Sequence, residues 1–420
     1  MSGPTSWGHA QPSSERCADT PLSADADAYL RYLTERGYAP RTIKGYCVNV
    51  AQFARWVARQ RVDHTHFDEK LIARFVDKHL LACRCEPRCR RTQKEARAAL
   101  GHLLEMLRAN GRCAGRCSAV PGAIAAEIGN FDRYLGEVRG LSPFTCSVRM
   151  RHLRDFLTEH FASGSIQLSS IGPADIARFI DKYTVGWAPG SIKQVAISLR
   201  SYFAYRASHG EQTTALIAAL PRVAQWRLAG LPQVLSEAEI TRLLNAFDRN
   251  TATGKRDYAI ARCLLDLGLR RTEVARVQLE DVDWRAGTLN IHTKGKRIDV
   301  LPLPEACGRA ITAYLRNGRP QTTRRELFVR HRPPINAAAG VDIVRNAVRN
   351  AAKRCGLEHR IRGTHIFRYT LAGRLVQGGA RFKEIADLLR HRNLDTTAIY
   401  AKVDLEALAR VALPWPGRQS

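Results

Sequence analysis

The sequence predicts a mainly α-helical protein with two small helical domains, followed by an α+β domain that contains a small β-hairpin. Apolar residues recur at helical spacing along most of the chain. One pattern of helices and turns occurs twice before residue 212, and two strand-like segments flank a turn near residue 295. At roughly 100–200 residues per domain, a chain of 420 residues has room for all three domains.

Two similar segments predict the first two domains. Residues 30–79 contain LRYLTERGYAPRTIKGY and ARFVDK, and residues 132–183 contain DRYLGEVRGLSPFTCSVRM and ARFIDK. A Gly and a Pro mark the same turn in both segments. Chance likeness between amphipathic helices is the alternative, but turns and apolar positions match over several helices together. We therefore expect helical domains over residues 22–115 and 122–212.

The third domain is expected over residues 231–414, after a linker rich in turn residues. Ser236 and Glu239 have the spacing of a capping box at the start of its first helix. Later elements are expected as a helix over 258–279, strands over 288–293 and 298–303, a third strand over 327–330, and helix from 341 onward.

The charge of the chain indicates a polyanionic partner. Lys and Arg number 66 against 39 Asp and Glu, which leaves a formal net charge of +27. The excess is spread along the whole sequence, and nucleic acid is the usual partner that neutralises such a surface. A basic cytosolic enzyme and a ribosome-associated or membrane-surface protein are the alternatives. No apolar run reaches the roughly 18 residues of a membrane helix, and the N-terminus lacks a secretory signal. We expect a cytoplasmic, nucleoid-associated protein without membrane contact.

Five of the eleven cysteines are clustered and could close a structural zinc site. Their C-x-C and C-x3-C spacings are not the common C-x2-C arrangement, so we predict no metal. The clustered residues are Cys83, Cys85, Cys89, Cys113 and Cys117.

The third domain carries a dispersed set of basic residues that ends in one tyrosine. Its pieces are GLRRTEV (268–274), HTKGKR (292–297), THIFRYTLAGRLVQGG (364–379) and LLRHRNLDTTAIYAKV (388–403). Guanidinium forks match the two charged oxygens of a phosphodiester and can stabilise its transition state. Tyrosine, lysine and histidine can supply a nucleophile and a proton without a cofactor. The set therefore predicts cofactor-free phosphoryl transfer on double-stranded DNA.

These pieces resemble the catalytic domain of the tyrosine recombinase (phage integrase) family, which includes the Xer and lambda-type enzymes. The segment GLSPFTCSVRMRHLRDFL similarly resembles the family's helical core-binding domain. One departure is Arg390, which stands where the family usually has glycine before its late histidine. The resemblance assigns six catalytic positions: Arg270 in G-L-R-x-x-E, Lys294 in the hairpin, the H-x-x-R pair His365 and Arg368, the late histidine His391, and the nucleophile Tyr400.

The resemblance implies a site-specific recombinase, the integrase or transposase of a bacterial mobile element, that needs neither metal nor ATP. It implies a 3′-phosphotyrosine intermediate and a homo-tetramer on DNA, alone or with sister recombinases. Residues 404–416 would form a terminal helix that docks into a neighbouring protomer. The alternatives are DNA relaxation like that of a type IB topoisomerase, and a non-catalytic DNA-binding protein on the same fold.

Overall fold

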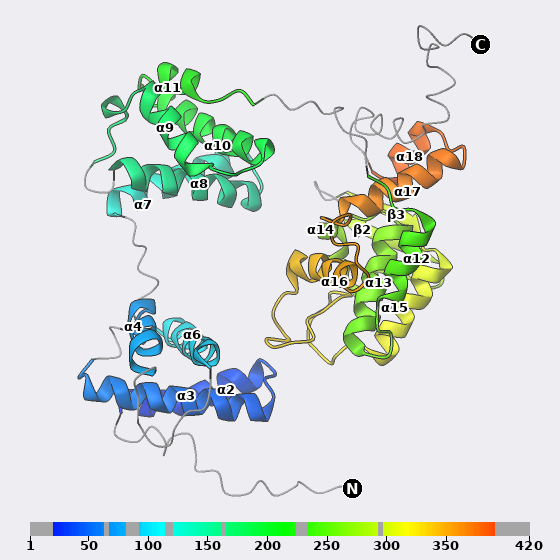
Figure 1. Ribbon diagram of the computed structural model, residues 1–420, viewed down its shortest axis with the longest axis horizontal. Coiled ribbons are helices and arrows are strands. Elements are labelled where there is room, and N and C mark those ends of the chain that lie inside the picture. Colours follow the sequence, from blue (N-terminus) through cyan, green and yellow to red (C-terminus); the bar gives the residue numbers. More distant parts are fainter. Residues whose placement is uncertain are drawn as a thin grey trace, which may run out of the picture. The chain divides into compact units, whose positions relative to one another are not determined.

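The computed structural model describes residues 20–62, 67–80, 92–113, 121–161, 165–223, 233–292 and 297–390 (Figure 1). These residues are mainly helical, and their only sheet has three strands, which confirms the predicted fold class. Two compact units divide the chain: one combines residues 1–113 with 230–420, and the other is 114–229. Within the described ranges, no helix combines the length and the apolar character needed to cross a membrane.

The N-terminal helices pack around an aromatic core. Phe53 contacts Phe75 edge to face, with their ring centroids 5.2 Å apart, and both side chains are buried. Thr92 and Glu95 form a capping box at the start of the last helix, which satisfies backbone N–H groups there. The elements are η1 (Ser23–Asp25), α2 (Ala26–Glu35), α3 (Pro40–Arg59), α4 (Glu69–Arg74), the π-helical turn η3 (Phe75–His79) and α6 (Gln93–Ala109).

Residues 114–229 form a unit with its own core, in which Phe131, Phe156 and Phe203 are fully buried. The succession of long and short helices resembles that of the N-terminal segment. ARFIDK lies within the helix over 173–183, whereas ARFVDK runs from the end of α4 through η3. The elements are α7 (Gly122–Arg133), the π-helical turn η4 (Tyr134–Val138), α8 (Pro143–Phe161), η5 (Leu168–Ser170), α9 (Pro173–Tyr183), α10 (Pro189–Ala207) and α11 (Thr214–Ala219).

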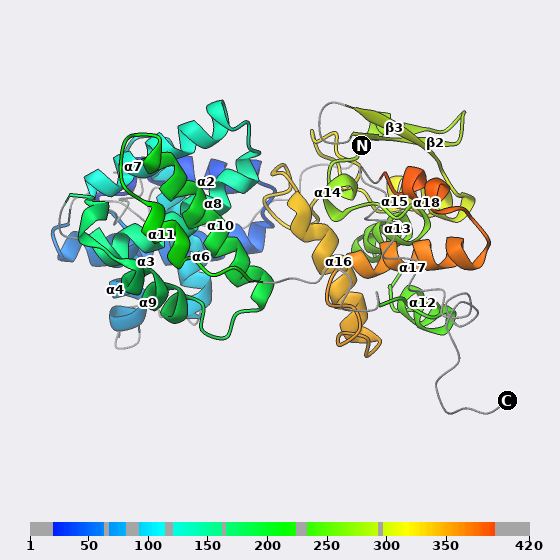
Figure 2. The same cartoon turned by 90° about the horizontal axis from the view of Figure 1, so that it is seen from above.

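The C-terminal region is built around one buried helix, α13, which contacts α14, α15, α16 and α17. An antiparallel sheet in the order β1-β2-β3 lies at the edge of these helices (Figure 2). The elements are α12 (Glu237–Asn245), α13 (Ala252–Asp266), α14 (Arg271–Val274), η6 (Leu279–Asp281), β1 (Val282–Asp283), β2 (Thr288–His292), β3 (Ile298–Pro302), α15 (Glu305–Asn317), α16 (Gly340–Arg354), α17 (His365–Gln377) and α18 (Phe382–Leu388).

Two sequence predictions in this region are wrong. The helix expected over 258–279 ends at Asp266, because Gly268 has a left-handed φ of +56° that no α-helix accommodates. The strand expected over 327–330 is absent: its apolar residues are buried in the core, and the only bridge nearby joins Gln278 to Glu326. The third strand is β1 instead. The hairpin strands β2 and β3 lie where the sequence predicts them.

Candidate active site

The turn between α13 and α14 is shaped by Gly268. Its φ is +56°, and a Cβ at this position would lie 2.8 Å from Cδ2 of Leu389 and 2.9 Å from Cδ2 of Leu371. Real side chains do not tolerate such distances, so glycine alone fits without displacement of these leucines. The turn brings the chain out of the core and places Arg270 immediately before α14.

Arg270 is held by the carboxylate of Glu273. The backbone N–H of Arg270 donates to Oε2 of Glu273 at 2.8 Å, and its Nη1 donates to Oε1 at 2.7 Å. The side chain of Glu273 is 7% exposed, whereas that of Arg270 is 38% exposed. The buried carboxylate of Glu273 therefore orients the guanidinium of Arg270, which is still open to solvent.

A second arginine, Arg390, lies on the other side of the same carboxylate. Its Nη2 donates to Oε2 of Glu273 at 2.9 Å, and its own carbonyl accepts from Nη2 of Arg270 at 3.3 Å. Burial raises the pKa of Glu273, but the positive charges of Arg390 and Arg270 and the backbone N–H of Arg270 outweigh it and lower the pKa below its usual value. Glu273 is thus ionised between two guanidinium groups.

Arg368 reaches the same turn from α17. The residue is 4% exposed, and its Nη1 donates to the carbonyl oxygen of Gly268 at 2.6 Å. This bond joins positions 100 residues apart in the chain. It brings the predicted H-x-x-R helix and the predicted G-L-R-x-x-E segment together.

His365 is the first residue of α17 and lies at the surface. The pKa of its imidazole is lowered, first by desolvation of the ring and then by the positive charges of Arg368, Arg270 and Arg271. The lowered pKa keeps the ring neutral near pH 7, so one nitrogen can accept a proton or a hydrogen bond. The structure therefore brings together three predicted site residues: Arg270, His365 and Arg368.

The other three predicted residues, Lys294, His391 and Tyr400, lie outside the described residues. In the sequence, Lys294 lies between the segments that form β2 and β3, and His391 directly follows Arg390. Their placement and the roles of all six residues stay predictions. Arg390 itself was not predicted as a site residue, and its replacement of the family's glycine was the available signal.

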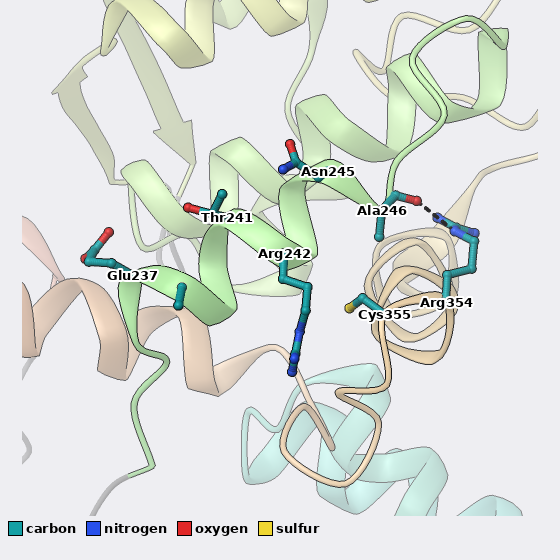
Figure 3. A pocket seen from close by; sticks show the side chains of 8 residues that line it. Glu237, Thr241, Arg242, Asn245, Ala246, Arg354 and Cys355 are labelled. Carbon is teal, nitrogen blue, oxygen red and sulfur yellow. Dashed lines mark hydrogen bonds between the residues drawn. The ribbon is translucent and has the colours of Figure 1, made fainter.

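The pocket in Figure 3 does not contain this site. It lies between α12 and the end of α16, has a volume of about 790 Å³ and is widely open. Arg354 crosses its edge, with Nε donating to the carbonyl oxygen of Ala246 at 2.8 Å. None of Arg270, His365 and Arg368 lines it. Arg270 and His365 are open to solvent, whereas Arg368 is buried. A long polyanion could reach the two open side chains from the surface.

Of the five clustered cysteines, the structure describes Cys113. Cys83, Cys85, Cys89 and Cys117 lie outside the described residues, and Cys113 is buried beside the N-terminal core. Burial raises the pKa of the Cys113 thiol. Among the residues that the structure describes, no three His, Cys, Asp or Glu side chains are grouped to hold a metal ion.

The sequence matches two family models. The phage integrase family matches residues 233–406, and the N-terminal SAM-like domain of phage integrases matches residues 26–111. The Sinorhizobium fredii protein y4rA, whose name describes it as an integrase/recombinase, is 34% identical over 404 residues, which cover 96% of each chain. The tyrosine recombinase XerD of Listeria monocytogenes is 28% identical over 66% of this chain and 93% of its own.

Solved structures share the fold. The XerH site-specific recombinase bound to palindromic difH substrate has a TM-score of 0.54 at 19% identity, over 81% of this chain and 93% of that one. The Tn1549 transposon integrase in complex with transposon right end DNA has a TM-score of 0.51 at 17% identity, over 68% and 99%. With the two family models and a full-length relative in agreement, the chain belongs to the phage integrase family and is an enzyme of the tyrosine recombinase type.

Proposed function

We propose that this protein cuts and rejoins double-stranded DNA at specific sites through a 3′-phosphotyrosine on Tyr400, as the integrase or transposase of a mobile element. The observation that carries the proposal is the convergence of Arg270 and Arg368 on one glycine turn, beside a histidine whose pKa is lowered. Two guanidinium groups beside a neutral imidazole suit a phosphodiester in a transition state that gathers negative charge. The recombinase relatives point to the same substrate.

The chemistry assigned to the six residues balances without a metal or ATP. The Tyr400 oxygen attacks the scissile phosphorus while its phenolic proton passes to the neutral imidazole of His365. The bond to the 5′-oxygen breaks, and Lys294 gives that oxygen a proton. Arg270 and Arg368 hold the non-bridging oxygens, His391 donates a hydrogen bond to them, and His365 takes part in proton transfer and positioning. A 5′-hydroxyl from a second DNA then attacks the phosphotyrosine, which reverses the reaction and releases Tyr400.

The proposal extends to architecture and assembly. Domains over residues 22–115, 122–212 and 231–414 would contact the duplex together, mainly through phosphates, so that affinity falls steeply with salt. Four protomers, alone or with sister recombinases, would hold two DNA sites for strand exchange. The enzyme would act on the nucleoid in the cytoplasm. The net charge of +27 and the DNA-bound structures of similar fold support this assignment.

The test uses nicked suicide duplexes made from the ends of the element that carries the gene. The nick lets the cleaved strand diffuse away, so a covalent protein–DNA complex accumulates on a denaturing gel. We expect a band with the wild-type protein that survives metal chelator and disappears in Tyr400→Phe. Tyr258→Phe, a tyrosine of α13 in the same region, is the matched control and should retain the band.

Two results would contradict the proposal. Salt-sensitive DNA binding without any covalent band would indicate a DNA-binding protein that does not cleave. Covalent cleavage together with relaxation of supercoiled plasmid that lacks the element ends would indicate topoisomerase-like activity rather than site-specific recombination.

A further inference from the structure

Arg390 has a backbone conformation that arginine rarely adopts. Its φ is +55°, in the left-handed region where a Cβ costs free energy and glycine is favoured. Its backbone N–H donates to the carbonyl oxygen of Asp387 at 3.0 Å, so the residue closes the C-terminal end of α18. An unfavourable conformation at a helix end needs a compensating interaction from the side chain.

The side chain of Arg390 makes that interaction in the interior. It is 5% exposed, and its Nη2 donates to Oε2 of Glu273, which is 7% exposed, at 2.9 Å. Its Nη1 donates to the carbonyl oxygen of Leu388 at 3.0 Å. A buried ion pair leaves an uncompensated charge when one partner is removed, so this contact constrains both residues strongly.

Arg390 is linked to Arg270 in two ways, through the carboxylate of Glu273 and through its own carbonyl oxygen. Glu273 accepts from Arg270 through Oε1 at 2.7 Å while it accepts from Arg390 through Oε2. The carbonyl oxygen of Arg390 accepts from Nη2 of Arg270 at 3.3 Å. With only one arginine, the carboxylate would neutralise Arg270. With two, the group of three side chains keeps one net positive charge, and the exposed member is Arg270.

We propose that Arg390 is a positioning residue of the recombination site. It fixes the chain immediately before His391 against Arg270, and it neutralises Glu273 so that the charge of Arg270 acts on the DNA phosphate. This inference rests on the proposed function of Arg270. Because Arg390 is buried and held by Glu273, it acts through Arg270 rather than on DNA directly.

The experiment measures single-turnover formation of the covalent complex on the nicked suicide duplex, with saturating protein, beside the dissociation constant for the same DNA. Arg390→Ala removes the guanidinium and keeps a Cβ, so the backbone cost at φ +55° stays. A displaced catalytic group commonly costs about 100-fold in rate, and we expect a fall of about 10- to 100-fold. DNA affinity should change by less than about 2-fold, since the phosphate contacts along the duplex are many. Added guanidinium ion should restore part of the rate by filling the vacated site.

Two further variants separate positioning from folding. Arg360→Ala removes an arginine that donates to Glu239 at 3.0 Å in the same region, and it should lower stability while the rate stays unchanged. Arg390→Gly relieves the backbone and also removes the ion pair, so it should be as slow as Arg390→Ala. Rescue by guanidinium ion should occur in both Arg390 variants and not in Arg360→Ala.

Three other outcomes would overturn the inference. An Arg390→Ala or Arg390→Gly rate equal to that of the wild type would show that the side chain has no role in cleavage. Parallel losses of rate, DNA affinity and melting temperature, without guanidinium rescue, would show a purely structural role. A wild-type chain that forms no covalent complex would remove the proposed function and this inference together, whereas unaffected Arg390 variants of a cleaving enzyme would remove the inference alone.

Discussion

The Nη1 of Arg368 donates a hydrogen bond of 2.6 Å to the carbonyl oxygen of Gly268, which ties α17 to the turn before Arg270. Arg368 is 4% exposed, so its charge is almost fully withdrawn from water and depends on such acceptors. Separation of the helix and the turn would leave that charge without this partner. This bond therefore helps to fix the spacing between the two arginine segments.

Replacement of Gly268 should distort this turn. Gly268→Ala adds a Cβ at φ +56° and within 2.9 Å of two leucine side chains, so we expect a loss of about 2–4 kcal/mol from backbone strain and overpacking. Urea titration of the purified protein measures it. Gly287→Ala is the control, because Gly287 has a similar φ of +63° with open space around it, and it should lose only about 1 kcal/mol. Equal losses would mean that the leucines move aside freely.

Arg368→Lys should weaken cleavage more than folding. A lysine keeps the charge but has no planar fork with which to bind the Gly268 carbonyl and a phosphate at once. We expect the rate of covalent complex formation to fall by about 100- to 1,000-fold, the usual effect of removing one transition-state donor. Arg374→Lys, on the same helix and paired with Glu237, should cleave normally. A similar rate in both variants would argue against phosphate binding by Arg368.

Glu273→Gln should destabilise the protein. The amide still accepts a hydrogen bond but has no charge to offset Arg270 and Arg390, so two close guanidinium groups repel each other. We expect a loss of about 3 kcal/mol, as for a broken buried ion pair. Glu239→Gln, whose carboxylate accepts from Arg360 nearer the surface, should lose about 1 kcal/mol or less. Unfolding by urea measures the free energy of unfolding of both variants. Equal losses would contradict the idea that Glu273 balances the charges of Arg270 and Arg390.

The stability of the protein should fall in acid because of His331. Burial of the ring and the nearby charge of Arg256 lower its pKa to about 4, whereas the unfolded value is about 6.5. Between these values the unfolded chain binds a proton that the native chain does not, so stability present above about pH 6.5 is lost as the pH falls toward 4, by up to about 1.4 kcal/mol per pH unit.

His331→Gln should remove that part of the pH dependence. The variant also loses the contact between His331 Nε2 and the Tyr314 hydroxyl, which are 3.2 Å apart, and this loss is measured at pH 8, where the histidine is neutral in both states. Melting temperatures of variant and wild type should therefore converge as the pH is lowered from 8 to 5. A constant difference across this range would show that His331 titrates normally in the native protein.

Local sequence patterns predicted most of the elements correctly. The hairpin strands, the capping box at Ser236 and the twofold succession of helices before residue 212 follow from periodicity and turn residues, which act over a few positions. The predictions that failed concern segments whose structure depends on residues far away in the sequence. The segment at 327–330 has the composition of a strand, but only its start pairs, through one bridge between Gln278 and Glu326 and a hydrogen bond from Leu327 to Val277, and its apolar side chains are buried in the core.

The sequence by itself determined the fold class, the family and which residue types carry the proposed chemistry, because motif order and helical spacing are properties of the chain alone. Only the tertiary structure decided how the site is held. Position 268 requires glycine because its φ is left-handed and because Leu371 and Leu389 fill the space beside it. Arg390 belongs with Arg270 because a buried carboxylate from a segment 117 residues away must be paired. Packing and desolvation act between residues far apart in sequence, so local patterns do not identify the partners of either residue.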